Sequence, residues 1–136
     1  MLIKSLKTLI KIGKRNLDDL VIEKGSLISK KESNERKISQ LISNLHSEQQ
    51  KYYNSEFAIY IESYKKDTEN KCQILVQEIN NINNKIQEIE DNIREKFAEV
   101  KRFEILLDKK IHEQKDKEEK EEAKNLDEIA TLKQTK

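Results

Sequence analysis

The chain has neither proline nor tryptophan, and among its 136 residues there are only two glycines and one cysteine. Sandwiches, barrels and α/β folds need glycine and proline at turns between β-rich runs, so the composition argues against these folds. One cysteine cannot form an intramolecular disulfide, which is compatible with a reducing compartment. Aromatic residues make up 5% of the chain, too few for a thick globular core.

Charged residues are abundant instead, at 39% of the chain against 35% apolar residues. This composition is typical of long helices that pack along a narrow seam. The formal net charge of +1 gives no overall attraction to nucleic acid, so we expect no nucleic-acid partner. No apolar run reaches the roughly 18–20 residues that a membrane span needs.

The apolar residues of the second half recur at alternating intervals of three and four, as in the seam of a coiled coil. After Ile93 the next apolar residue is Phe97, four residues later where three were due. We therefore expect a stutter at Phe97, with the stripe continuing from Val100 to Ile111. The regular series consists of Cys72, Leu75, Ile79, Ile82, Ile86, Ile89 and Ile93.

The first half keeps the same count from Leu17 to Tyr52, with weaker residues at several seam positions. Polar seam residues cost stability and can select register and partner number. Residues 29–37 contain no apolar residue at all. The polar seam residues are Lys24, Lys31, Asn34 and Glu48.

Two such stripes predict a long antiparallel coiled-coil hairpin, a single all-α domain over residues 1–136. Helix 1 is expected at about 3–53, a turn at about 54–56 and helix 2 at about 57–132. Asn54 tolerates the left-handed conformation at a helix end, and Ser55 can cap the next helix. The numbers of facing residues then add up to about 112, which places Ile38 opposite Ile74. Helix 2 is longer than helix 1, so everything past about Ile111 overhangs as a charged helix.

Residues 1–15 carry five basic residues and no acid, whereas residues 113–128 are rich in acids. The hairpin brings these blocks to the same end, where they can compensate each other's unfavourable helix-dipole positions. The basic start also fits a transit peptide or a membrane-surface helix. The apolar periodicity resumes at Leu17 and Leu20, which favours the simple start of a helix.

Motifs for chemistry are incomplete. His112 and Glu113 begin an HExxH zinc motif, but the fifth residue is Asp116 and His46 lies far away. Cys72 sits on the seam, where cysteine usually packs as a small hydrophobe. The two glycines stand alone within helical pattern; they cost helix stability or permit a close helix contact. We expect no enzyme activity, no cofactor and no metal site.

Five aromatic residues fall within thirteen positions around the expected turn. They either cap the end of the hairpin core or form an exposed patch that anchors a protein partner. The five are Tyr52, Tyr53, Phe57, Tyr60 and Tyr64.

The overhanging tail combines charge with an apolar face of Leu126, Ile129, Ala130 and Leu132. These residues have no expected partner in the chain, which indicates a docking element; frayed disorder is the alternative. Opposite charges spaced by four residues would support the helix. The pairs are Glu113–Lys117, Lys115–Glu119, Asp116–Lys120, Lys117–Glu121 and Lys124–Glu128.

The C-terminal part resembles the FliJ family, the coiled-coil stalk proteins of the bacterial flagellar type III export apparatus. The resemblance rests on Lys101-Arg102, the Leu106-Leu107 pair, the charged run and the ending KxLDEIA at residues 124–130. Residues 6–25 are similar to the leading helix of that family. The short, tyrosine-rich turn region departs from it.

The resemblance implies a cytoplasmic stalk at the inner-membrane export apparatus, monomeric alone, whose two chain ends insert into the hexameric export ATPase and promote its assembly and activity. It also implies contacts with an export-gate membrane protein and with export chaperones. By position, the gate contacts would be Tyr60, Tyr64 and Thr68. The ATPase contacts would be Leu6, Leu9, Ile10, Lys124, Leu126, Asp127 and Ile129.

Two other functions remain open from the residues. The seam could drive self-association of a structural coiled-coil protein that has no ATPase partner. The basic residues of the N-terminal helix could instead hold a peripheral protein on a membrane surface.

Overall fold

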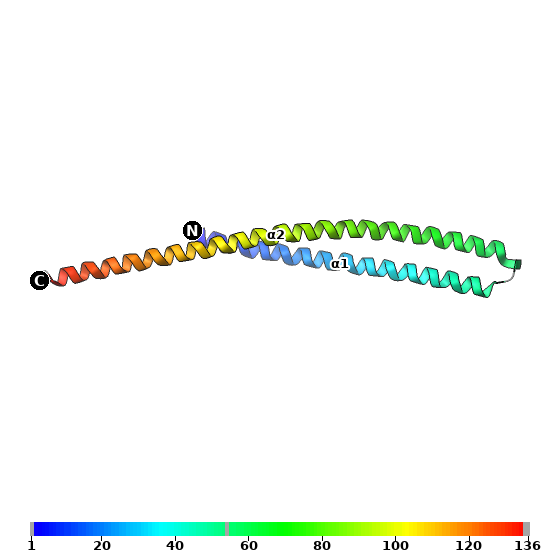
Figure 1. Cartoon of the computed structure of the whole chain (residues 1–136), viewed down its shortest axis with the longest axis horizontal. Helices are drawn as coiled ribbons and strands as arrows, with labels where there is room; N and C mark the ends of the chain where they lie inside the picture. The colour runs from blue at the N-terminus through cyan, green and yellow to red at the C-terminus, as the bar shows by residue number, and fades with distance from the viewer. Residues whose placement is uncertain (1, 54, 135–136) are drawn as a thin grey trace. The chain divides into compact units, whose positions relative to one another are not determined.

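The computed structural model describes residues 2–53 and 55–134, and nearly all of them are helical. In chain order the elements are α1 (Leu2–Lys51), the short 3₁₀ helix η1 (Ser55–Phe57) and α2 (Ala58–Gln134) (Figure 1). The described residues contain no strand. The expected all-α hairpin of two long helices that pack against each other is therefore confirmed.

The bend between the two helices follows the end of α1 at Lys51 and precedes η1, which begins at Ser55. The amide of Tyr52 donates to the carbonyl oxygen of Glu48 at 3.1 Å and so closes the last turn of α1. Lys51 occupies that last turn, where a positive charge is favourable at the carbonyl end of the helix dipole. The expected roles of Asn54 and of the Ser55 side chain lie outside the described part of the chain.

Contacts divide the chain into two units, which we describe separately. Unit 1 consists of Met1–Asp18 and Arg94–Lys136, and unit 2 consists of Asp19–Ile93. In each unit a part of α1 packs against a part of α2.

In unit 2 the predicted seam is the buried stripe. Every seam position of α1 from Leu20 to Tyr52 is buried or half-buried, and so is every seam position of α2 from Cys72 to Ile93. The Nδ2 atom of Asn34 donates to Oε2 of Glu78 at 3.0 Å, and the two residue numbers add up to 112. This contact confirms the predicted register.

In unit 1 the start of α1 lies beside the middle of α2 (Figure 1). Leu6, Ile10 and Gly13 are buried in α1, and Val100 is buried in α2. A Cβ atom built on Gly13 would lie 2.5 Å from Cγ2 of Val100. Gly13 was expected either to cost helix stability or to permit a close helix contact, and the structure supports the close contact.

The stutter expected at Phe97 is wrong. Phe97 is 54% exposed, and the half-buried position is Lys96, which keeps the spacing of three from Ile93 and four to Val100. The ammonium of Lys96 lies 3.1 Å from the carboxylate of Glu99. A lysine can cover a seam with its alkyl stem while its charged end stays in solvent, so the heptads continue without a break.

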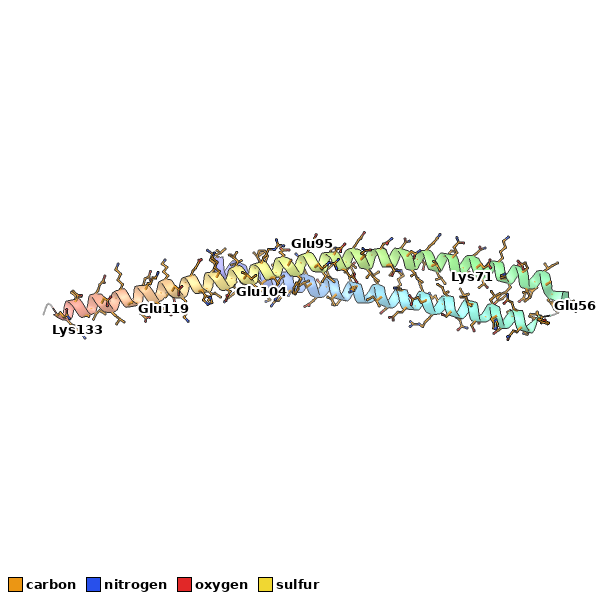
Figure 2. The ribbon with its side chains drawn as sticks, in the orientation of Figure 1. Glu56, Lys71, Glu95, Glu104, Glu119 and Lys133 are labelled. Carbon is orange, nitrogen blue, oxygen red and sulfur yellow. The ribbon has the colours of Figure 1, made fainter. Side chains whose placement is uncertain are left out.

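The tail of α2 extends beyond the start of α1 within unit 1 (Figure 1). Every residue from Ile111 to Gln134 is exposed. Figure 2 shows the side chains of Glu119 and Lys133 on this stretch, with no second helix next to them. The predicted overhang is thus present in unit 1.

The ion pairs expected along the tail differ from those found. Among the described residues, none of the five predicted pairs at a spacing of four is in ion-pair contact, and the pair at the base of the tail joins Lys110 to Glu113 at 3.4 Å. Exposed pairs gain little in water and lose side-chain entropy when they form. The tail helix therefore depends on the helix propensity of its alanine, lysine, glutamate and leucine residues.

Candidate interaction surfaces

The tail of α2 presents an apolar row without a helix to cover it. Leu126, Ile129 and Leu132 are 64%, 50% and 66% exposed. Their spacing of three residues keeps them on neighbouring turns of one side of the helix. An exposed apolar row on a charged helix is the usual form of a helix that docks into an apolar groove.

Polar residues flank this row and complete the surface. Lys124, Asp127, Glu128 and Thr131 line a shallow depression together with Leu132. The hydroxyl of Thr131 donates to the carbonyl oxygen of Asp127 at 2.9 Å, which holds that side chain against its own helix. The tail positions taken from the family resemblance, Lys124, Leu126, Asp127 and Ile129, are therefore all accessible on one short stretch.

The N-terminal positions from the same resemblance do not share one environment. Leu6 and Ile10 are 2% and 9% exposed, and they belong to the core of unit 1. Leu9 is 44% exposed. In this structure Leu9 is available to a partner, whereas Leu6 and Ile10 hold α1 against α2.

Further exposed apolar residues near Leu9 were missed by sequence reasoning. Leu2 is half-exposed and, with Ile3, lines a groove against Lys110 and Glu113 of α2. Leu106 is 38% exposed. Leu2 and Leu9 are seven residues apart and next to the seam, so the heptad count would have found them as one row.

Charges around the start of α1 are mostly exposed. Lys4, Lys7 and Lys11 are exposed. The ion pair that joins the two helices of unit 1 is Lys14 with Glu104, at 3.6 Å (Figure 2 labels Glu104). This pair uses Glu104, which lies outside the acidic block 113–128, so it is not the expected contact between the basic start and that block.

The aromatic cluster at the bend is packed against itself. The ring of Tyr52 lies 5.0 Å from that of Phe57 and 5.5 Å from that of Tyr60, and Tyr60 lies 6.2 Å from Tyr64. Tyr53, in contrast, is 89% exposed. Four of the five aromatic residues therefore pack against one another at the bend, and Tyr53 is the most exposed of the five.

The Tyr60 hydroxyl donates to Oε2 of Glu48 at 3.5 Å and links α2 to α1. Desolvation in the cluster, together with the negative charge of Glu48, raises the pKa of Tyr60 above its ordinary value. Both effects disfavour the phenolate next to a carboxylate. Tyr60 is therefore a neutral hydrogen-bond donor in this bend.

The residues expected to contact an export gate are only partly accessible. Tyr60 is 48% exposed, Tyr64 is half-buried and Thr68 is 5% exposed. Ile59 was not singled out from the sequence, yet it is 89% exposed. Tyr53 and Ile59 are thus the most exposed large apolar residues of the bend, ahead of Phe57 and Tyr60.

The remaining candidates for chemistry lie apart from one another. Nδ1 of His112 lies 2.9 Å from the carbonyl oxygen of Asp108, and Nε2 of His46 lies 3.1 Å from the amide of Gln50. Cys72 is half-buried on the seam. Within the described residues no three histidines, cysteines or carboxylates gather into a metal-binding group. No described helix is long and apolar enough to cross a membrane.

Comparison with known proteins gives one match. No curated protein and no solved structure matches the chain. The model of the family described as flagellar FliJ protein matches residues 3–134, which include both helices and the exposed tail. The chain belongs to the flagellar FliJ protein family.

Proposed function

We propose that this flagellar export-apparatus protein is a stalk and adaptor whose paired chain ends enter the ring of a hexameric export ATPase and promote the assembly and activity of that ring. Its family consists of structural export components and is not known as an enzyme family. The observation that carries the proposal is the exposure of Leu126 and Ile129, 64% and 50%, on the overhanging tail of α2.

The exposure of the residues supports a narrower choice of ATPase contacts. Leu126 and Ile129 make the apolar contact, with Lys124 and Asp127 as polar neighbours. Leu9 is the contact on α1. The buried Leu6 and Ile10 act through the hairpin, because they fix the start of α1 against α2 and so position Leu9.

In this proposal the bend between α1 and α2 is the contact with the export gate. Tyr53 and Ile59 are its most exposed apolar residues, and Tyr60 and Tyr64 support them from within the aromatic cluster. Thr68 is buried and contributes to packing. Binding to the gate would hold this stalk in the cytoplasm at the inner membrane, and export chaperones would meet it there.

The test is stimulation of the export ATPase by the purified chain. Double substitution Leu126→Ser/Ile129→Ser is expected to weaken binding at least tenfold, because buried apolar anchors commonly contribute 2 kcal/mol or more and about 1.4 kcal/mol is tenfold. The control is Ile22→Ser, which removes from α1 an isoleucine that is 70% exposed, more than Leu126 or Ile129. Its stimulation should equal that of the parent.

Truncation after Lys120 should abolish stimulation and leave most of the helix signal in circular dichroism, since every residue from 121 to 134 is exposed. Unchanged stimulation by either tail variant would remove the tail from the mechanism. An absence of both stimulation and co-elution with the parent chain would reject the proposal as a whole.

A further inference from the structure

The two facing seams of unit 2 differ in polarity. The α2 seam is apolar throughout from Cys72 to Ile93, and it faces an α1 seam that contains Lys24, Lys31 and Asn34. An apolar α1 seam would bury more apolar surface against the same helix. Maximal stability therefore does not explain the polar residues of the α1 seam.

Each of two α1 seam groups has its partner on α2. Asn34 is 3% exposed, and its amide donates to Oε2 of Glu78 at 3.0 Å. The ammonium of Lys24 lies 3.2 Å from Oε1 of Glu90. Polar groups at a seam are tolerated when such partners satisfy them, so these contacts depend on correct alignment of the helices.

A slip of one heptad in either direction removes these partners. A slip of α2 by one heptad would replace Glu90 with Asn83 or Phe97 beside Lys24. The same slip would replace Glu78 with Lys71 or Lys85 beside Asn34. Neither shifted register offers a carboxylate to either group, whereas the apolar contacts would be largely retained.

We propose that Lys24, Lys31 and Asn34 specify the pairing of α1 with α2 in a single register and prevent α1 from pairing with the α1 of a second copy. In a parallel pair of two α1 helices, the lysines would meet each other across the seam. Single polar residues at such positions are known to select register and oligomer state in coiled coils. This inference does not depend on the export ATPase.

The first test is the mass of the variant Lys24→Leu/Lys31→Leu/Asn34→Leu by size exclusion with light scattering. The parent chain is expected at its monomer mass of 16.1 kDa. The triple variant is expected to remain helical, to melt at a higher temperature and to at least double in mass at the same concentration. The matched control Asn84→Leu, at an exposed position of α2, is expected to stay monomeric.

The second test measures the distance between two spin labels, one on each helix, and this distance reports the register. Spin labels on cysteines introduced at the exposed Ser43 and Gln87, with Cys72→Ser, report the alignment of the helices of unit 2. The parent seam is expected to give one narrow distance. A one-heptad slip moves the labels by about 10 Å along the axis, so the triple variant should add a second population.

A charge exchange tests the ion pair between Lys24 and Glu90 without introducing leucine into the seam. Lys24→Glu alone places two carboxylates together and should broaden the distance distribution, and adding Glu90→Lys should restore the single peak. The inference is overturned if the triple variant stays at 16.1 kDa with one distance. It is equally overturned if the parent itself associates, or if Asn84→Leu associates as strongly as the triple variant.

Discussion

Replacement of each glycine by alanine tests how closely the two helices of unit 1 approach. A Cβ on Gly13 would lie 2.5 Å from Cγ2 and 3.9 Å from Cβ of Val100. A Cβ on Gly25 would meet nothing within 4 Å. Both glycines lie inside α1, so alanine improves helix propensity equally at the two positions. The steric cost differs, because only a Cβ at Gly13 meets another side chain.

The magnitudes follow from these surroundings. Glycine to alanine in a helix interior stabilises by about 0.8–1.0 kcal/mol, so Gly25→Ala should raise the free energy of unfolding by that amount. Overpacking of a seam costs about 1–3 kcal/mol, and the branched side chain of Val100 has little freedom to turn away. Gly13→Ala should therefore lose up to about 2 kcal/mol, despite its gain in helix propensity.

The assay is thermal and urea unfolding followed by circular dichroism at 222 nm. Gly25→Ala should raise the melting temperature by roughly 3–5 °C, and Gly13→Ala should lower it. In a Val100→Ala background the collision is gone, so Gly13→Ala should become stabilising there, which is a coupling that only contacting residues show. Equal stabilisation by both alanines in the parent would refute the close approach at Gly13.

Two further predictions concern the bend and the seam. Because the pKa of Tyr60 is raised in the folded chain, its contribution to stability is complete below the unfolded value of about 10 and is lost as pH rises through the folded value. Tyr60→Phe should therefore remove this alkaline loss in pH-dependent unfolding, and an unchanged profile would contradict the assignment. Phe97→Ala should cost less than about 1 kcal/mol because Phe97 is 54% exposed, whereas Ile89→Ala, at a site 6% exposed, should cost about 2–5 kcal/mol in urea unfolding. Equal losses of stability in the two variants would indicate that Phe97 is a buried seam residue.

Much of the hairpin was predictable from spacing alone. The alternation of three and four located the buried stripe of both helices, and polar residues such as Asn34 did not hide it. The register followed from placing the turn at the tyrosine-rich segment, and the contact between Asn34 and Glu78 confirms it. Periodicity works here because a coiled coil repeats one local geometry many times.

Features that depend on the facing helix were not predictable in the same way. At Phe97 the apolar residue is exposed and Lys96 takes the seam, because position in the heptad outweighs residue type over one turn. At Gly13 both readings fitted the sequence, and only the position of Val100 decides between them. Likewise, Leu6, Leu9 and Ile10 form one apolar group in the sequence, but the facing helix covers only two of them.

The length of the exposed tail of α2 determines where its apolar row lies. From Ile111 to Gln134 every residue is exposed, so burial against α1 does not set the position of the apolar row along the tail. Adding or removing a residue would shift the apolar row by about 1.5 Å along the axis and by about 100° around it. Insertions of seven residues would nearly preserve its direction. The distance at which this protein presents Leu126 and Ile129 can thus vary in steps of a heptad without any change in the hairpin that carries them.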